Sequence, residues 1–90
     1  MNSLAELKRR CTPGTHIHIE NHLRPQGTRD TVVLAKTNTV DLVTDHPDAP
    51  YGSHLAWPKA KSLRFVGDDV VVIEAGGDRF LTITFTGGPA

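Results

Sequence analysis

The sequence has little cysteine, no excess of charge of either sign and no long apolar run. Cys11 is its one cysteine among 90 residues, so no disulfide within the chain can stabilise the fold, which agrees with a reducing compartment. The 10 basic residues (Lys and Arg) balance the 10 acidic ones, and this neutrality argues against a protein built mainly to hold a polyanion. The longest apolar runs, at residues 32–35 and 70–73, are far too short to span a membrane.

A chain of 90 residues corresponds to one small domain and leaves little room for a second domain or a deep active-site cleft. Hydrophobic residues make up 38% and charged residues 22% of the chain, a mix that can form a core and argues against disorder. Charged residues from Glu6 to Arg10 interrupt any signal-like segment at the start. We therefore expect a single domain over residues 1–90, located in the cytoplasm.

The first dozen residues have the spacing of a short helix. Ser3 and Glu6 are spaced as a capping box, and an apolar residue recurs at positions 4, 7 and 11, which gives one apolar face over about residues 3–11. Pro13 and Gly14 then end the helix. The basic residues of its last turn are Lys8, Arg9 and Arg10. Cations interact favourably with the carboxyl end of a helix dipole, and the alternative role for these three side chains is to contact phosphates.

From residue 15 onward the apolar residues recur with a period of two, which is typical of strands with one buried face. Ile17 and Ile19 alternate with polar residues, and the same alternation places Leu81, Ile83 and Phe85 on one buried face. Further strands are expected at residues 31–36, from residue 40, and at 54–57, 63–65 and 70–74, with a 3₁₀ turn near 59–62.

Residues 45–53 contain two prolines, two aspartates and one glycine, so we expect them to form the longest loop. The chain has 10 Thr, 8 Val and 4 Ile residues, and this β-branched content argues against a helical bundle. Short strands joined by tight turns predict a mainly β fold, a small antiparallel barrel of the SH3-like or OB-like type with a short N-terminal helix. We expect the barrel over about residues 14–86 and a frayed tail at 87–90.

Five histidines and one cysteine raise the question of a metal site. The pattern Cys-x4-His-x-His-x3-His runs through Cys11, His16, His18 and His22, but its spacing matches neither a zinc finger nor a zinc ribbon. An exposed polar strand face is the simpler explanation, and a metal site and a pH-sensitive surface are the alternatives. The sequence has no phosphate-binding glycine loop and no nucleophile with a recognisable base. We therefore predict no enzymatic activity, no metal and no cofactor.

The segment between residues 51 and 64 combines aromatic and cationic side chains. Its members are Tyr51, His54, Trp57, Lys59, Lys61 and Arg64. Small barrels bind single-stranded nucleic acid or peptides by pairing aromatic faces with cations, so these six residues are the candidate binding site. In the competing interpretation Trp57 is a core residue, because it shares a strand face with Leu55, and the lysines form a solvated rim.

Short motifs are distributed along most of the chain: Leu4-x-x-Leu7-Lys8-Arg9-Arg10, Pro13-Gly14-Thr15, Val32-Val33, Thr37-Asn38, and Trp57-Pro58-Lys59-Ala60 followed by Arg64. This arrangement resembles a group of small uncharacterised single-domain proteins of actinobacteria and their phages. The resemblance brings no activity and no site residues with it. It implies a cytoplasmic accessory protein, encoded by a phage or prophage, that binds a host component.

Two functions follow from these observations. The first is a non-enzymatic binding module that acts through protein contacts, favoured by the zero net charge and by the lack of an assembled catalytic set. The alternative is a nucleic-acid-binding barrel that uses the 51–64 segment, with Lys8, Arg9 and Arg10 as outlying phosphate contacts. A metal-binding domain ranks third, and no membrane association is expected.

Overall fold

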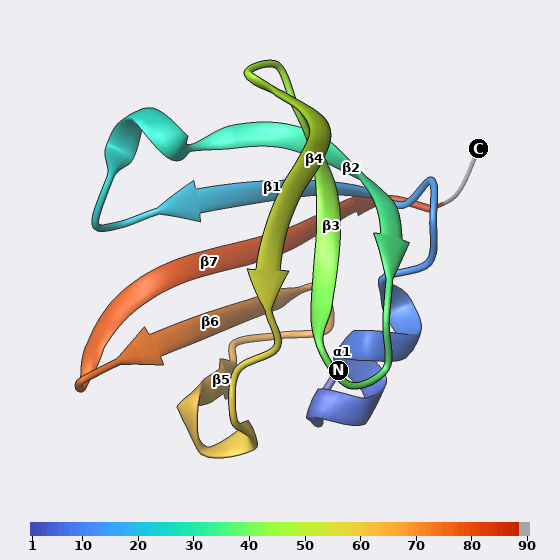
Figure 1. Cartoon of the computed structure of the whole chain (residues 1–90). Helices are drawn as coiled ribbons and strands as arrows, with labels where there is room; N and C mark the ends of the chain where they lie inside the picture. Colours follow the sequence, from blue (N-terminus) through green and yellow to red (C-terminus); the bar gives the residue numbers. More distant parts are fainter. Residues whose placement is uncertain (89–90) are drawn as a thin grey trace.

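Seven antiparallel strands and one short helix make up the chain in the computed structural model, which describes residues 1–88 (Figure 1). In chain order the elements are α1 (Leu4–Arg10), β1 (His16–Asn21), η1 (Pro25–Gly27), β2 (Arg29–Lys36), β3 (Asp41–His46), β4 (Ala49–Ala56), η2 (Ala60–Ser62), β5 (Leu63–Phe65), β6 (Val70–Ala75) and β7 (Asp78–Gly87). The strands form one sheet in the order β4-β3-β2-β1-β7-β6-β5. The predicted mainly β class with an N-terminal helix is confirmed.

The sheet bends along strand β2. Residues 29–32 pair with β1, and residues 33–36 pair with β3. The register shifts between Val33 and Ala35, and such an irregularity bends a strand and increases its twist. In Figure 1, β2 first follows β1 and then turns down beside β3. As a result, β3 and β4 cross the direction of β1, β7 and β6.

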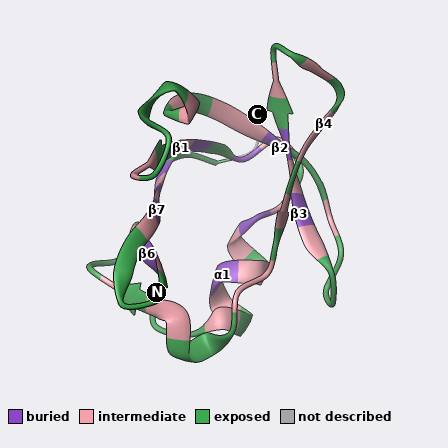
Figure 2. Ribbon diagram, turned by 60° about the vertical axis from the view of Figure 1, so that its left-hand side comes forward, coloured by how far each residue is buried: buried purple, intermediate pink, exposed green. Residues whose placement is uncertain are grey.

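The two ends of the sheet do not pair with each other. Strands β4 and β5 are its edges, so within residues 1–88 the sheet is not closed into a barrel. Helix α1 occupies the open side (Figure 2). Lys8 Nζ donates to the backbone carbonyl of Asn38, between β2 and β3, at 2.7 Å, and Arg10 Nη2 lies 2.7 Å from Asp69 Oδ1, between β5 and β6. The helix thus connects the two arms of the bent sheet.

The hydrophobic core lies between the bent sheet and α1. It consists of Leu7, Cys11, Ile17, Ile19, Val33, Leu42, Val71, Ile73, Leu81, Ile83 and Phe85. The three β7 residues that the sequence assigned to one buried face, Leu81, Ile83 and Phe85, are all buried, so that prediction is confirmed. Cys11 is also fully buried, and desolvation raises the pKa of its thiol from 9.0 to about 11. It therefore packs as a small hydrophobic residue.

The predicted helix cap is present at the start of α1. Ser3 Oγ accepts a hydrogen bond from the backbone N–H of Glu6 at 3.1 Å, as expected for an N-cap residue. The Glu6 carboxylate accepts from the backbone N–H of Asn2 at 2.8 Å, and this bond is the main reason why the pKa of that carboxyl is lowered. The helix spans Leu4–Arg10, one residue less at each end than the sequence indicated.

The prediction that residues 45–53 form a long loop is wrong. Strand β3 continues to His46, which lies opposite Ala49, so a two-residue turn joins β3 and β4. Pro50 is tolerated within β4 because this strand lies at the sheet edge, where a missing donor is harmless. Gly52 has a φ of +87°, and a Cβ there would lie 2.7 Å from Cγ1 of Val43. Proline and glycine occur in this segment because it contains an edge strand whose pairing with β3 is irregular. The same residues are typical of loops, so sequence composition alone does not distinguish the two.

Other boundaries differ by smaller amounts. The 3₁₀ turn near residues 59–62 is confirmed as η2, and β4 begins five residues before the strand expected at 54–57. Strand β7 runs to Gly87, so the frayed tail expected at 87–90 does not include Gly87, and its last two residues lie outside the described part of the chain. Within the described residues, no helix is long and apolar enough to cross a membrane.

Candidate functional site

The aromatic residues of the 51–64 segment do not form one surface. Tyr51 lies on the edge strand β4 and its side chain is 90% exposed. Trp57 is partly buried and packs against the core, and its indole Nε1 donates to the backbone carbonyl of Thr37 at 2.7 Å. Lys8 Nζ lies 5.7 Å from the centre of the Trp57 ring. Trp57 thus holds the β2–β3 connection and α1 together, which agrees with its interpretation as a core residue.

Several cations of the predicted sites are engaged within the protein. Lys8 bonds to Asn38, as described above, and Arg10 contacts both the Asp68 carbonyl and the Asp69 carboxylate. The guanidinium carbon of Arg10 also lies 4.2 Å from the centre of the Phe85 ring. Arg64 Nε lies 3.0 Å from Glu74 Oε1. These contacts engage all three side chains within the protein, and the ion pairs of Arg10 and Arg64 offset part of the charge of the predicted basic surface. Exposed pairs of this kind contribute at most about 1 kcal/mol to stability.

Three further cations of the predicted sites are exposed: Arg9, Lys59 and Lys61. Within residues 1–88, the side chains of these three residues form no hydrogen bond and no ion pair. His54, which also belongs to the 51–64 segment, is exposed, and its Nδ1 lies 2.6 Å from Asp41 Oδ2 on the neighbouring strand β3. The predicted binding residues are therefore divided between structural contacts and isolated exposed side chains.

The histidines and Cys11 do not converge on a metal. Cys11 belongs to the core, whereas His18 Nδ1 lies 2.8 Å from Asp30 Oδ1 and His22 Nε2 lies 2.8 Å from Thr82 Oγ1. In the part of the chain that the structure describes, no group of three or more His, Cys, Asp or Glu side chains is arranged to hold a metal ion.

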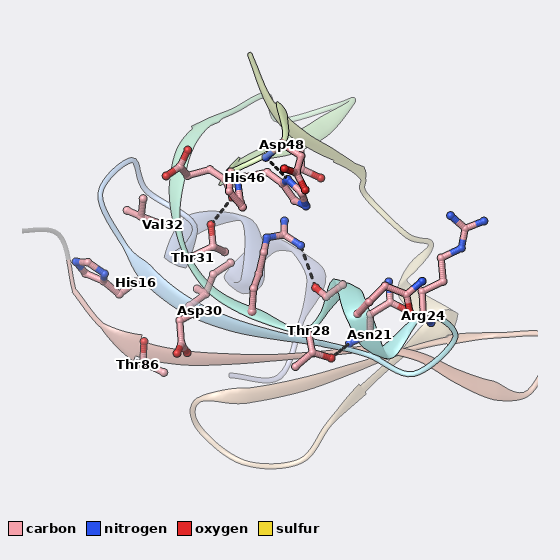
Figure 3. Close-up of a pocket in the computed structure, with 17 residues that line it drawn as sticks. His16, Asn21, Arg24, Thr28, Asp30, Thr31, Val32, His46, Asp48 and Thr86 are labelled. Atoms are coloured by element: carbon pink, nitrogen blue, oxygen red, sulfur yellow. Dashed lines mark hydrogen bonds between the residues drawn. The ribbon is translucent and has the colours of Figure 1, made fainter. Parts of the chain in front are cut away.

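An open groove of about 1010 Å³ is lined mainly by residues of β1, β2, their connection and the β3–β4 turn. It lies between the β3–β4 turn and the segment from Asn21 to Thr28. Figure 3 shows His46 and Asp48 on one side and Asn21 and Thr28 on the other. The charged residues of its lining are two arginines and three aspartates: Arg24, Arg29, Asp30, Asp45 and Asp48. A groove with both signs of charge suits a peptide better than a uniform polyanion.

Hydrogen bonds hold the groove walls in place. The side-chain oxygen of Asn21 accepts from the backbone N–H groups of Leu23 and Arg24, at 3.0 and 2.8 Å, which fixes the turn before η1. Thr31 Oγ1 donates to the backbone carbonyl of Asp45 at 2.6 Å, joining β2 to β3. These bonds support the residues on both sides of the groove.

Arg29 stands out among the groove residues. It lies on the inward face of β2, opposite Ile19. Its Nη1 donates to the backbone carbonyl of Gly27 at 3.1 Å and its Nη2 donates to Thr44 Oγ1 at 3.0 Å. Its Nε is buried and has no hydrogen-bond partner within residues 1–88. Burial lowers the pKa of this guanidinium, and Asp45 opposes that effect; the side chain nevertheless stays charged.

Sequence reasoning missed Arg29 and the groove. The sequence predicts that this strand begins at residue 31, so Arg29 lies outside the predicted strand. Extending the period of two backwards from Val33 through Thr31 would have placed Arg29 on the buried face, and a cation there is an unusual feature.

Comparison with known proteins adds no family to this description. The chain matches no protein-family model, no curated protein and no solved structure.

Proposed function

We propose that this chain is a non-enzymatic binding module that acts through protein contacts, with the groove as its contact surface. The observation that carries the proposal is the lining of the groove, in which Arg24 and Arg29 lie among three aspartates. Nucleic acid presents phosphates of one sign only and would be repelled by those carboxylates. A polypeptide offers donors, acceptors and charges of both signs, which such a lining can complement. The bent seven-stranded sheet carries the groove, which is the role expected of the SH3-like or OB-like barrel.

The contacts of the basic residues support the same conclusion. Three of the basic side chains already have partners within the protein: Lys8 with Asn38, Arg10 with Asp69 and Arg64 with Glu74. Binding a phosphate would require them to give up these contacts.

That the protein is cytoplasmic and encoded by a phage or prophage stays a prediction from the resemblance.

A nucleic-acid-binding role is the second candidate. It is favoured by the exposed Lys59 and Lys61, whose side chains form no ion pair within the described residues. If these lysines and Arg64 bind phosphates, affinity for single-stranded DNA must fall with salt, with a logarithmic slope of about −0.7 per contact. We expect no binding tighter than micromolar near physiological salt.

The deciding experiment is affinity capture from a lysate of the source cells, with and without nuclease. The groove variant Arg24→Glu with Asp48→Lys keeps the net charge unchanged, and both side chains are exposed. The matched control, Asp78→Lys with Arg79→Glu, makes the same exchange outside the groove. We expect a protein partner that survives nuclease and is captured by the control but not by the groove variant. Capture that disappears with nuclease, together with submicromolar DNA binding that Lys59→Ala and Lys61→Ala abolish, would favour the second candidate.

A further inference from the structure

We propose that the groove recognises a carboxylate group, with the Arg29 guanidinium as the residue that binds it. The proposal rests on the protein-binding function above and names the chemical group that the partner presents. Arg29 lines the groove, and within residues 1–88 no Asp or Glu oxygen lies within 4.0 Å of its nitrogen atoms. It is therefore a partly buried cation that no carboxylate contacts directly, although Asp45 lies near enough to act on its pKa.

The hydrogen bonds of Arg29 leave donors unused. Its two observed partners, the Gly27 carbonyl and the Thr44 hydroxyl, are neutral, and a guanidinium has more N–H donors than these two acceptors satisfy. A partly buried charge that meets only neutral acceptors is costly, because it loses water without gaining a counterion. The planar guanidinium matches the two oxygens of a carboxylate. A bound carboxylate would thus supply a negative charge in direct contact and acceptors for the remaining Nη donors.

The remaining charges of the groove select a carboxylate over a phosphate. Asp30, Asp45 and Asp48 line the groove together with the two arginines, so a dianion would meet stronger repulsion than a monoanion. A single negative charge meets less of this repulsion, and direct contact with the Arg29 guanidinium offsets it. The carboxylate can come from an Asp or Glu side chain or from the C-terminus of a polypeptide, and both sources share this chemistry.

The buried Nε–H of Arg29 gives a direct readout, because it is shielded from water and its NMR signal reports on the guanidinium. Sodium acetate should shift this signal saturably, with a Kd on the order of 1 mM. Two controls should leave the signal without a saturable shift: sodium chloride at the same concentration, and acetamide, which has the shape of acetate without its charge. Two peptides distinguish the sources. One is acetylated and amidated at its ends and contains one internal glutamate, and the other is acetylated, has no acidic residue and ends in a free C-terminus. A peptide with both ends blocked and no acidic residue is the negative control.

Variants test whether Arg29 itself binds the carboxylate. Replacing Arg29 removes its Nε–H, so binding to these variants is followed through the backbone amide signals of Gly27 and Thr44, the two residues that contact Arg29. Arg29→Gln should weaken acetate binding by about 10- to 100-fold, the range expected for hydrogen bonds to a charged group. Arg79→Gln removes an exposed arginine outside the groove and should leave binding unchanged. If Arg29→Gln does not fold, Arg29→Lys keeps the charge but loses the planar fork, and it should weaken binding in the same direction.

The proposal is overturned if wild-type Arg29 shows no saturable response to acetate or to either acidic peptide, or if Arg29→Lys and Arg29→Gln bind as the wild type does. Its failure is separate from that of the proposed function. Loss of the captured partner in the Arg24→Glu, Asp48→Lys variant, without an acetate response, would leave the groove as a protein-binding surface of another chemistry. An acetate response with unchanged partner capture would instead identify a carboxylate site that the protein partner does not use.

Discussion

The mutation Ile83→Ala tests the position of the core most directly. Ile83 is 0% exposed and lies on an interior strand of the sheet, opposite Ile19 of β1 and Val71 of β6. The substitution removes three carbon atoms, and at about 0.8 kcal/mol for each buried methylene-sized group this costs about 2.4 kcal/mol in transfer free energy. Two flanking strands hold the β7 backbone in place, so the site cannot collapse fully and a cavity term adds to this loss. We expect a decrease in unfolding free energy of about 2–5 kcal/mol.

Urea denaturation followed by circular dichroism measures this loss as a shift of the midpoint at constant slope. Thr84→Ala is the matched control, because Thr84 lies on the same strand with its side chain on the opposite face and forms no side-chain hydrogen bond within residues 1–88. It should cost about 0.5 kcal/mol or less, as surface substitutions do. If Ile83→Ala also costs less than about 0.5 kcal/mol, the register of β7 is incorrect and the reasoning fails.

Two further predictions concern backbone strain and the buried thiol. Gly52→Ala should destabilise the protein by about 1–3 kcal/mol more than Gly76→Ala in the same urea assay. Both glycines have a positive φ, but only a Cβ at position 52 would clash, with Val43. Equal losses of unfolding free energy in the two variants would contradict this close contact. The pKa of Cys11 is raised from 9.0 to about 11 by burial, so folding favours the protonated thiol, and the stability this gives is present below pH 9 and lost as the pH rises to about 11. The unfolding free energy of the wild type relative to Cys11→Ala should therefore decrease between pH 9 and 11, and a pH-independent difference would show that the thiol is not desolvated.

Features that depend on neighbouring residues in the chain were predictable from the sequence. The alternation of Ile17 and Ile19 and of the apolar residues in β7 reports directly which side chains face the core, because a strand repeats every two residues. The Ser3 cap and the turn at residues 59–62 are also local, since their hydrogen bonds join residues three positions apart. These patterns were sufficient for the mainly β class and for the short N-terminal helix.

Only the tertiary structure decided how the strands are assembled. Residues 45–53 contain the prolines and glycine of a loop, yet they form a hairpin because β4 lies at an edge where Pro50 and Gly52 are tolerated. The bend of β2 and the insertion of α1 between the two arms depend on contacts such as Lys8 with Asn38 and Arg10 with Asp69, which join residues far apart in the chain. The groove arises in the same way. Arg29 meets its two neutral hydrogen-bond partners only when Gly27 of η1 and Thr44 of β3 come together around it. Local periodicity fixes which face of a strand a residue occupies, whereas its neighbours across the sheet depend on long-range packing.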